Sequence, residues 1–335
     1  MNMVRIGDPV RRDEDYRLIK GRGRYADDVN EARQARAFVL RSPHAHADIV
    51  AIDTAAAIAA PGVLAVLTGD DLTARGLGSQ KPANTGRKAD GSPGFVCSQP
   101  LLAQGRVRFT GQPVAFVVAE SVNQAKDAAE LINVDYAPLA AVVTADEALA
   151  DGAPSVWDDN PGNEAFTHQI GDQDAVDAAF AAAKHVVRHR VCVNRVTANG
   201  LETRGCIASY DDYEDRYTLR ATIQSVHGTR AILAQQIFKI PQTKIRVICD
   251  NMGGGFGTKG GCYPEYSLAL WASEVIGRPV KWIAERSEAI LTDEHGRGGL
   301  VDAELALDED YNFLALRTHT KVPIGAYFTT DRNIG

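Results

Sequence analysis

The chain has 335 residues, of which 45% are hydrophobic and 24% are charged. This length can bury one or two substantial cores, and no apolar run approaches the roughly 18 residues that a membrane span requires. The net charge of −7 disfavours nucleic acid as a partner. The first residues lack the apolar stretch of a secretory signal, so we expect a cytoplasmic protein.

Alternating strand and helix patterns predict a first domain over residues 1–145. The expected strands are 35–41, 63–67, 113–118 and 134–136, and the expected helices are 54–60 and 122–132. Ser121 is a suitable N-cap for the second helix, which together with its flanking strands forms an expected strand–helix–strand unit. The segment 71–93 is rich in Gly, Lys and Asn and predicts an exposed loop.

A polar segment with two prolines, residues 146–163, predicts a linker to a second domain over residues 164–335. The patterns that follow indicate helices at 175–183 and around 227–238, and strands at 186–193, 217–223 and 245–248.

Five cysteines are scattered without a C-x-x-C pair, which disfavours a zinc or iron–sulfur cluster and predicts reduced, mostly buried thiols. His44 and His46 are two residues apart, and His185 and His189 are four apart. Each pair lies in an expected loop or strand without a third ligand nearby, so we assign no metal ligand.

A glycine-rich segment follows the expected strand at 245–248. Six glycines in the nine positions 253–261 leave the main chain almost without side chains, so its N–H groups can approach an oxyanion closely. The helix after it is expected to begin near Pro264 and to end near Gly277. Its expected apolar face consists of Leu268, Leu270, Trp271 and Val275.

Two other interpretations of this segment compete with an oxyanion cradle. Gly255, Gly257 and Gly260 satisfy the G-x-G-x-x-G spacing of a dinucleotide-binding turn, but the acidic residue expected about twenty positions later is missing. A nicotinamide-dependent Rossmann dehydrogenase is therefore the weaker alternative. A turn without any ligand is the other. A P-loop is excluded, because Lys259 is followed by glycine and not by Ser or Thr.

The string from Asp250 to Lys259 closely resembles the glycine-rich segment of the molybdenum-binding large subunit of the xanthine dehydrogenase/aldehyde oxidase/carbon monoxide dehydrogenase family. Other segments resemble the same family in order: Ile6–Val10, Gly21–Asp28, Arg41–Ala47, Gly111–Ala115, Asn133–Tyr136, Leu201–Gly205 and Thr222–Ser225. The resemblance implies an α+β fold. A hammerhead-like α/β domain is followed by the first part of a molybdopterin-binding α+β domain.

The resemblance also implies which residues meet the cofactor. Gln224 stands where the family's glutamine donates a hydrogen bond toward an oxo ligand of molybdenum. Gly254, Gly255, Phe256 and Gly257 stand where main-chain amides meet oxo and dithiolene groups. An amide suits this role, because its own charge does not change during the reaction.

Four further polar or glycine positions are given other roles. Glu202 and Arg204 occupy the family's Glu-x-Arg signature and are expected to form a structural salt bridge or loop anchor rather than to catalyse. Lys259 is expected to be a solvated loop lysine rather than a residue that pairs with the pterin phosphate. Gly260 stands where xanthine-type members place a substrate-facing glutamate, which argues against carboxylate recognition of a purine here.

The implied function is that of a molybdenum hydroxylase large subunit carrying molybdopterin cytosine dinucleotide. Such an enzyme oxidises an aldehyde, an N-heterocycle or carbon monoxide with water as the oxygen source. Electrons pass to an iron–sulfur small subunit and an FAD-binding medium subunit, in a dimer of heterotrimers. This chain itself is expected to hold neither an iron–sulfur cluster nor a flavin.

The resemblance places the family's catalytic base and its arginine- or cysteine-bearing loop beyond Gly335, so no catalytic residue is assigned in this chain. We therefore expect the amino-terminal part of a larger subunit, inactive and without cofactor when alone. A non-catalytic fold or assembly fragment of the family is the alternative from a different functional class.

Overall fold

The computed structural model describes residues 6–82 and 85–329, and the end of the predicted second domain, residues 330–335, lies outside them. Its main element is a seven-stranded mixed sheet in the order β11-β10-β9-β12-β1-β5-β3. The strands are β1 (Ala35–Arg41), β3 (Val63–Thr68), β5 (Pro113–Ala119), β9 (Gly205–Asp211), β10 (Arg216–Ala221), β11 (Ile245–Ile248) and β12 (Val280–Ile283). The predicted α+β class is confirmed.

The main sheet contains strands from both predicted domains. Strand β1 pairs in parallel with β12, with Ala35 opposite Val280. Backbone hydrogen bonds therefore join segments that are more than 240 residues apart in sequence. The boundary at 146–163 stays a prediction, but the two segments on either side of it share one sheet.

Helices cover both faces of this sheet. Helix α8 (Pro264–Ile276) packs on β9 and β12, and α4 (Val122–Glu130) packs on β1 and β5. Strand β5 is buried at every position, because alternate side chains enter different cores. Phe116 and Val118 belong to the core beneath α8, whereas Ala115 and Val117 belong to the core beneath α4.

The Ser121 cap of α4 is confirmed, since its Oγ accepts a hydrogen bond from the Gln124 N–H at 3.3 Å. The expected strand–helix–strand succession is confirmed, but its two strands belong to different sheets. Strand β6 (Asn133–Pro138) pairs with β2 (Ala47–Asp53) in a separate sheet of order β4-β2-β6, with β4 at Arg106–Val107. The cause is that β1 and β3 already occupy both edges of β5.

The predicted exposed loop at 71–93 is wrong in its first part. Helix α3 (Gly69–Arg75) occupies its start, and Leu72, Leu77 and Gln80 are buried. These side chains are buried because this stretch lies against a π-helical turn at Leu233–Phe238, where the Gly78 N–H donates to the Ile237 oxygen.

Helix α8 begins and ends as predicted, at Pro264 and before Gly277, whose φ of 60° gives the left-handed C-terminal cap. The expected single apolar face is wrong. All residues from Pro264 to Ser273 are buried, and Val275 is 52% exposed. The outer side of the helix is covered because segment 69–103 contributes residues such as Leu101 to the same core.

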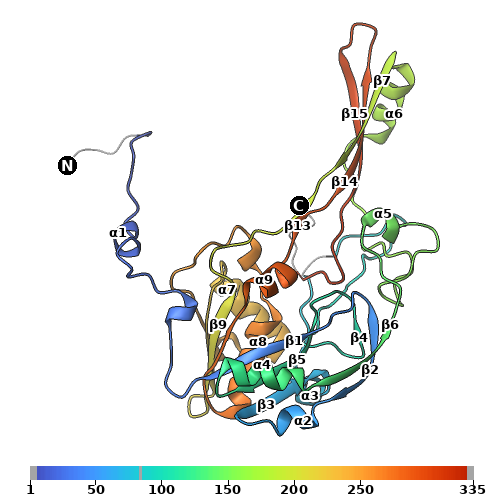
Figure 1. Cartoon of the computed structure of the whole chain (residues 1–335). Helices are drawn as coiled ribbons and strands as arrows, with labels where there is room; N and C mark the ends of the chain where they lie inside the picture. Colours follow the sequence, from blue (N-terminus) through green and yellow to red (C-terminus); the bar gives the residue numbers. More distant parts are fainter. Residues whose placement is uncertain (1–5, 83–84, 330–335) are drawn as a thin grey trace.

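A three-stranded sheet projects from this body (Figure 1). Its order is β15-β14-β7, with β7 at His185–Cys192, β14 at Leu300–Leu307 and β15 at Phe313–Lys321. Helix α6 (Gln173–Ala182) covers one of its faces (Figure 1). Shorter elements are α1 (Asp15–Leu18), α2 (Ala55–Ile58), α5 (Ala145–Ala148), α7 (Val226–Ile232), α9 (Arg286–Thr292), β8 (Arg195–Val196) and β13 (Gly296–Arg297). In the described part of the chain, every helix is too short or too polar to cross a membrane.

Candidate cofactor-binding site

Gln224 and the glycine loop lie together because the strands that precede them are parallel neighbours. Strand β10 runs alongside β11 with Arg220 opposite Ile248, so both chains leave the same edge of the sheet. The Gln224 N–H donates to the main-chain oxygen of Lys259 at 2.8 Å. A Cβ on Gly255 would lie 2.7 Å from the Gln224 Cδ, so the missing side chain lets Gln224 occupy its present position.

The loop backbone combines residues with positive and negative φ. Gly254, Phe256 and Gly257 have φ values of 98°, 48° and 94°. Such alternation creates a concave set of main-chain donors that suits an anion. Among the described residues, the N–H groups of Gly254, Gly255 and Phe256 have no hydrogen-bond partner. Gly255 is buried, so a ligand that accepts its hydrogen bond would relieve an unsatisfied donor.

The Glu202 side chain holds the start of the glycine loop by hydrogen bonds. Its Oε2 accepts from the Gly253 N–H at 2.7 Å, and its Oε1 accepts from the Ala26 N–H at 3.1 Å. Lys259 Nζ donates to the main-chain oxygen of Glu202 at 2.7 Å. The carboxylate therefore joins the amino-terminal arm to the start of the loop.

The expectation that Lys259 is solvated is wrong, because the residue is only 3% exposed. Burial lowers the pKa of its ammonium, and the nearby Glu202 carboxylate opposes that shift. The Lys259 ammonium is buried and paired with the Glu202 carboxylate. The loop donors that remain without a partner, the N–H groups of Gly254, Gly255 and Phe256, are neutral.

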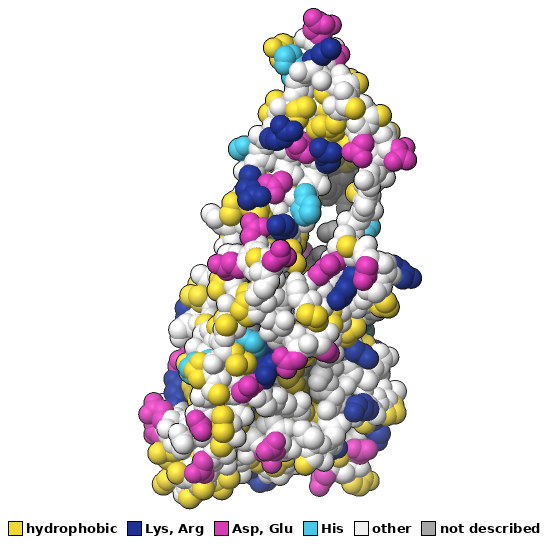
Figure 2. Space-filling view, turned by 90° about the vertical axis from the view of Figure 1, so that its right-hand side faces the viewer, with side chains coloured by type: hydrophobic (Ala, Val, Ile, Leu, Met, Phe, Trp, Pro, Cys, Tyr) yellow, Lys and Arg dark blue, Asp and Glu magenta, His cyan; other side chains and the backbone are white. Residues whose placement is uncertain are grey.

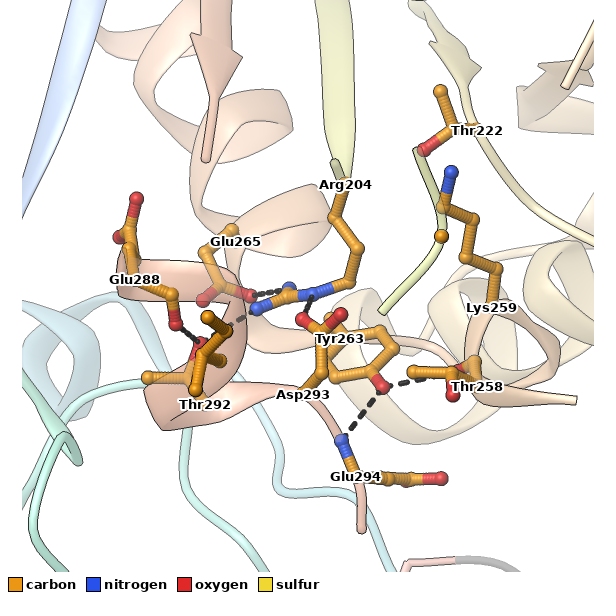
Figure 3. A network of polar contacts seen from close by, with 12 residues as sticks. Arg204, Thr222, Thr258, Lys259, Tyr263, Glu265, Glu288, Thr292, Asp293 and Glu294 are labelled. Atoms are coloured by element: carbon orange, nitrogen blue, oxygen red, sulfur yellow. Dashed lines mark hydrogen bonds and ion pairs between the residues drawn. The ribbon is translucent and has the colours of Figure 1, made fainter. Parts of the chain in front are cut away.

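Arg204 lies at the centre of a buried network (Figure 3). It donates to Asp293 Oδ1 at 2.5 Å, to Glu265 Oε2 at 2.8 Å and to Thr292 Oγ1 at 2.9 Å. Its guanidinium also lies 3.8 Å from the centre of the Tyr263 ring. The predicted structural role of Glu202 and Arg204 is confirmed by these contacts.

Glu265 links Arg204 to the first segment of the chain. Its other oxygen accepts from Arg41 at 2.6 Å, and Arg41 also donates to Glu288 at 2.6 Å. Burial alone would raise the pKa of Glu265, but Arg204 and Arg41 lower it to about 2. Burial raises the pKa of Glu288, and the neighbouring Glu265 charge adds to that shift. Glu265 therefore remains ionised near neutral pH.

Tyr263 connects this network to the loop (Figure 3). Its hydroxyl donates to the Thr258 main-chain oxygen at 2.9 Å and accepts from the Glu294 N–H at 3.0 Å. No sequence motif marks Tyr263, Asp293 or Glu288 as part of the site. Glu265 could have been found, since a carboxylate inside an otherwise apolar helix requires a cation partner.

The other candidate polar residues lie apart from the loop. His46 is 7% exposed, and its Nδ1 lies 2.8 Å from the Ala140 oxygen. His185 and His189 lie on β7 of the projecting sheet. Within residues 6–82 and 85–329, no group of three or more His, Cys, Asp or Glu side chains is arranged to hold a metal.

The dinucleotide-binding alternative gains no support from the geometry. A 3₁₀ turn at Thr258–Gly260 separates Gly257 from α8, so the helix does not begin within the motif as such a turn requires. Strand β12, which follows α8, pairs with β9 and β1 and not with β11.

Two family models match the chain. Residues 20–140 match the aldehyde oxidase and xanthine dehydrogenase a/b hammerhead domain, and residues 156–334 match the molybdopterin cofactor-binding domain. This chain belongs to the aldehyde oxidase and xanthine dehydrogenase family. The family resemblance of the sequence is thereby confirmed.

Relatives within this family have different substrates in their names. The carbon monoxide dehydrogenase large chain of Afipia carboxidovorans is 39% identical and matches 96% of this chain and 40% of its own length. The nicotine 6-hydroxylase large subunit of Paenarthrobacter nicotinovorans is 36% identical over 96% of this chain and 38% of its own. The crystal structure of quinoline 2-oxidoreductase from Pseudomonas putida superposes with a TM-score of 0.85 at 37% identity, over 94% of this chain and 39% of that one. The chain thus spans about two fifths of the length of the relatives it matches.

Proposed function

We propose that this chain supplies one wall of the molybdopterin site in a molybdenum hydroxylase large subunit. The wall consists of the Gln224 amide and the main chain of Gly254 to Gly257. The observation that carries the proposal is the set of unpartnered N–H groups in this loop, directly beside a glutamine side chain.

The donor set fits the cofactor chemically. Oxo and dithiolene ligands of molybdenum accept hydrogen bonds, and neutral amides donate without changing charge during a redox cycle. The Lys259 ammonium is paired with Glu202, so it is not free to bind the cofactor. When bound, the cofactor supplies the two-electron chemistry that hydroxylates a substrate with oxygen from water. The role of Gln224 and the loop is to hold and orient its acceptor groups.

Finer points of the proposal follow from the family resemblance of the sequence. We propose molybdopterin cytosine dinucleotide as the form of the cofactor, and an iron–sulfur subunit and an FAD-binding subunit as electron-accepting partners. The substrate class is an aldehyde, an N-heterocycle or carbon monoxide. Names of relatives that include carbon monoxide dehydrogenase and nicotine 6-hydroxylase support this range. Gly260 makes carboxylate recognition of a purine at that position unavailable.

Molybdate can test the loop donors in the full 335-residue chain. We expect added molybdate to shift the backbone amide NMR signals of Gly254, Gly255 and Phe256, because its oxo groups accept the same hydrogen bonds. Gly255→Ala is expected to abolish these shifts, since the new Cβ collides with Gln224. Gly296→Ala is the matched control, because a Cβ there meets nothing within 4 Å. Shifts that avoid the loop, or that survive in Gly255→Ala, contradict the proposal.

A further inference from the structure

The projecting sheet has one charged face. Strand register places Arg188, Glu304 and Arg317 in one cross-strand row and Arg190 beside Asp302 in the next. Arg188 donates to Glu304 Oε1 at 2.7 Å, and Arg190 donates to Asp302 Oδ2 at 2.7 Å. Each of the three arginines on this face thus has a carboxylate partner within the sheet.

Helix α6 lies on the same charged face. The Arg317 guanidinium lies 4.2 Å from the centre of the Phe180 ring, and Arg317 also pairs with Asp177 at 3.2 Å. Figure 2 shows Lys, Arg, Asp and Glu side chains distributed over the projecting part.

The opposite face of the sheet, called the bare face here, is largely apolar and exposes several of its side chains. The same register places two mainly apolar rows on it, and the row between them consists of His189, Ala303 and Thr318. One mainly apolar row consists of Val187, Leu305 and Leu316. The other consists of Val191, Val301 and Thr320. Val187 is 54% exposed, Val191 40% and Leu316 62%.

This arrangement is the reverse of the usual one for a sheet with one solvated side. An antiparallel sheet normally turns its apolar face toward a core and its charged face toward water. A contiguous exposed apolar face marks a surface that another polypeptide covers. Since the two mainly apolar rows offer no carboxylate, ammonium or guanidinium group, an occupant that is apolar over these rows leaves no charge buried without a partner.

We propose that the bare face docks the polypeptide region that makes up the remaining three fifths of the large chain in this family. The relatives carry that much sequence beyond the matched part. Strand β14 also begins seven residues after Asp293, so the projecting sheet is joined by a short segment to the buried network beneath the loop. This inference rests on the proposed function for the identity of the occupant.

Co-purification tests the docking without any cofactor. The full chain, carrying an affinity tag, is co-expressed in molybdenum-free medium with the part of the Afipia carboxidovorans large chain that lies outside the matched region. We expect the two polypeptides to co-purify. Val187→Asp and Leu316→Asp are each expected to lower the yield of complex at least about tenfold, because a carboxylate would be buried in an apolar contact. Val50→Asp is the matched control, at an exposed valine (63%) on β2.

Hydrogen exchange of the purified complex gives a second measurement that needs no variant. Amides of residues 185–193 and 313–321 are expected to exchange more slowly in the complex than in the chain alone. Absence of a complex, equal yield from the Asp variants, or unchanged exchange in both segments overturns the proposal. Self-association of the chain that the same variants abolish also overturns it, since a second copy would then be the occupant. The two proposals can fail separately. If the polypeptides co-purify but molybdate does not shift the loop amides, the docking inference holds and the proposed function is wrong.

Discussion

Lys259 Nζ donates to the main-chain oxygen of Glu202 at 2.7 Å, while the Glu202 carboxylate accepts from the Gly253 N–H at 2.7 Å. This pair of side chains thereby holds both ends of the glycine loop. Gly253 is at its start and Lys259 at its end. These contacts support the loop at both ends and leave the N–H groups of Gly254, Gly255 and Phe256 without a partner among the described residues.

Replacing Lys259 with methionine tests this support. The change keeps the buried aliphatic stem and removes the ammonium, so we expect a loss of about 1 to 3 kcal/mol in the free energy of unfolding. The amides of Gly254 to Gly257 are expected to exchange faster with solvent. Denaturant unfolding and hydrogen exchange measure the two effects. Lys244→Met, at a lysine with a 39% exposed side chain, is the control and is expected to change neither. Unaltered loop exchange in Lys259→Met contradicts the supporting role.

Glu265→Gln tests the buried network. Glu265 bridges Arg204 and Arg41, and its removal leaves two buried guanidinium groups with less compensation. Breaking a buried ion pair in this way lowers the free energy of unfolding by about 3 to 5 kcal/mol. Urea unfolding at neutral pH measures the loss. Glu214→Gln, whose side chain is 58% exposed beside Arg216, is expected to cost less than about 0.5 kcal/mol. Similar losses in both variants would show that the network contributes no more than a surface pair.

The same carboxylate predicts an acid dependence of stability. The folded pKa of Glu265 is about 2, below the ordinary value of 4.5. A depressed folded pKa contributes stability that is present above the ordinary value and is lost as the pH falls toward the folded one. Wild-type stability is therefore expected to fall between about pH 4.5 and 2. Glu265→Gln is expected to fall less steeply over this interval. Equal slopes in urea titrations of the two proteins would exclude Glu265 as a source of the acid sensitivity.

Local signals in the sequence predicted local structure well. Pro264 and Gly277 marked the ends of α8 because proline suits the first helical turn and glycine the left-handed cap. The burial of Lys259 escaped prediction because its partner Glu202 lies 57 positions earlier. The Arg41 to Glu265 contact joins residues 224 positions apart, a distance over which periodicity carries no information. The sequence therefore indicated the loop and Gln224, but not the charged network that supports them.

Gln224→Ala removes the side-chain amide that, in the proposed function, donates a hydrogen bond to the cofactor. In a complete subunit with its electron-accepting partners, we expect turnover to fall by a factor corresponding to about 2.7 to 4 kcal/mol, as for the loss of a preorganised oxyanion donor. The fold is expected to survive, because the Gln224 side chain is exposed and only its main-chain N–H bonds to Lys259. Gln169→Ala, at another exposed glutamine, is the control. Unchanged turnover in Gln224→Ala, with the cofactor still bound, would remove Gln224 from the site.

The chain on its own is expected to retain little or no molybdenum when purified. The wall of Gln224 and Gly254 to Gly257 offers donors on one side only, whereas a bound cofactor loses translational and rotational freedom worth about 4 to 15 kcal/mol. Hydrogen bonds from one wall offset only part of that cost. Elemental analysis and a pterin fluorescence assay measure the content, with the co-purified complex as the comparison. We expect the complex to hold more of both than the chain. Stoichiometric molybdenum in the chain alone would show that the Gln224 wall is sufficient for binding.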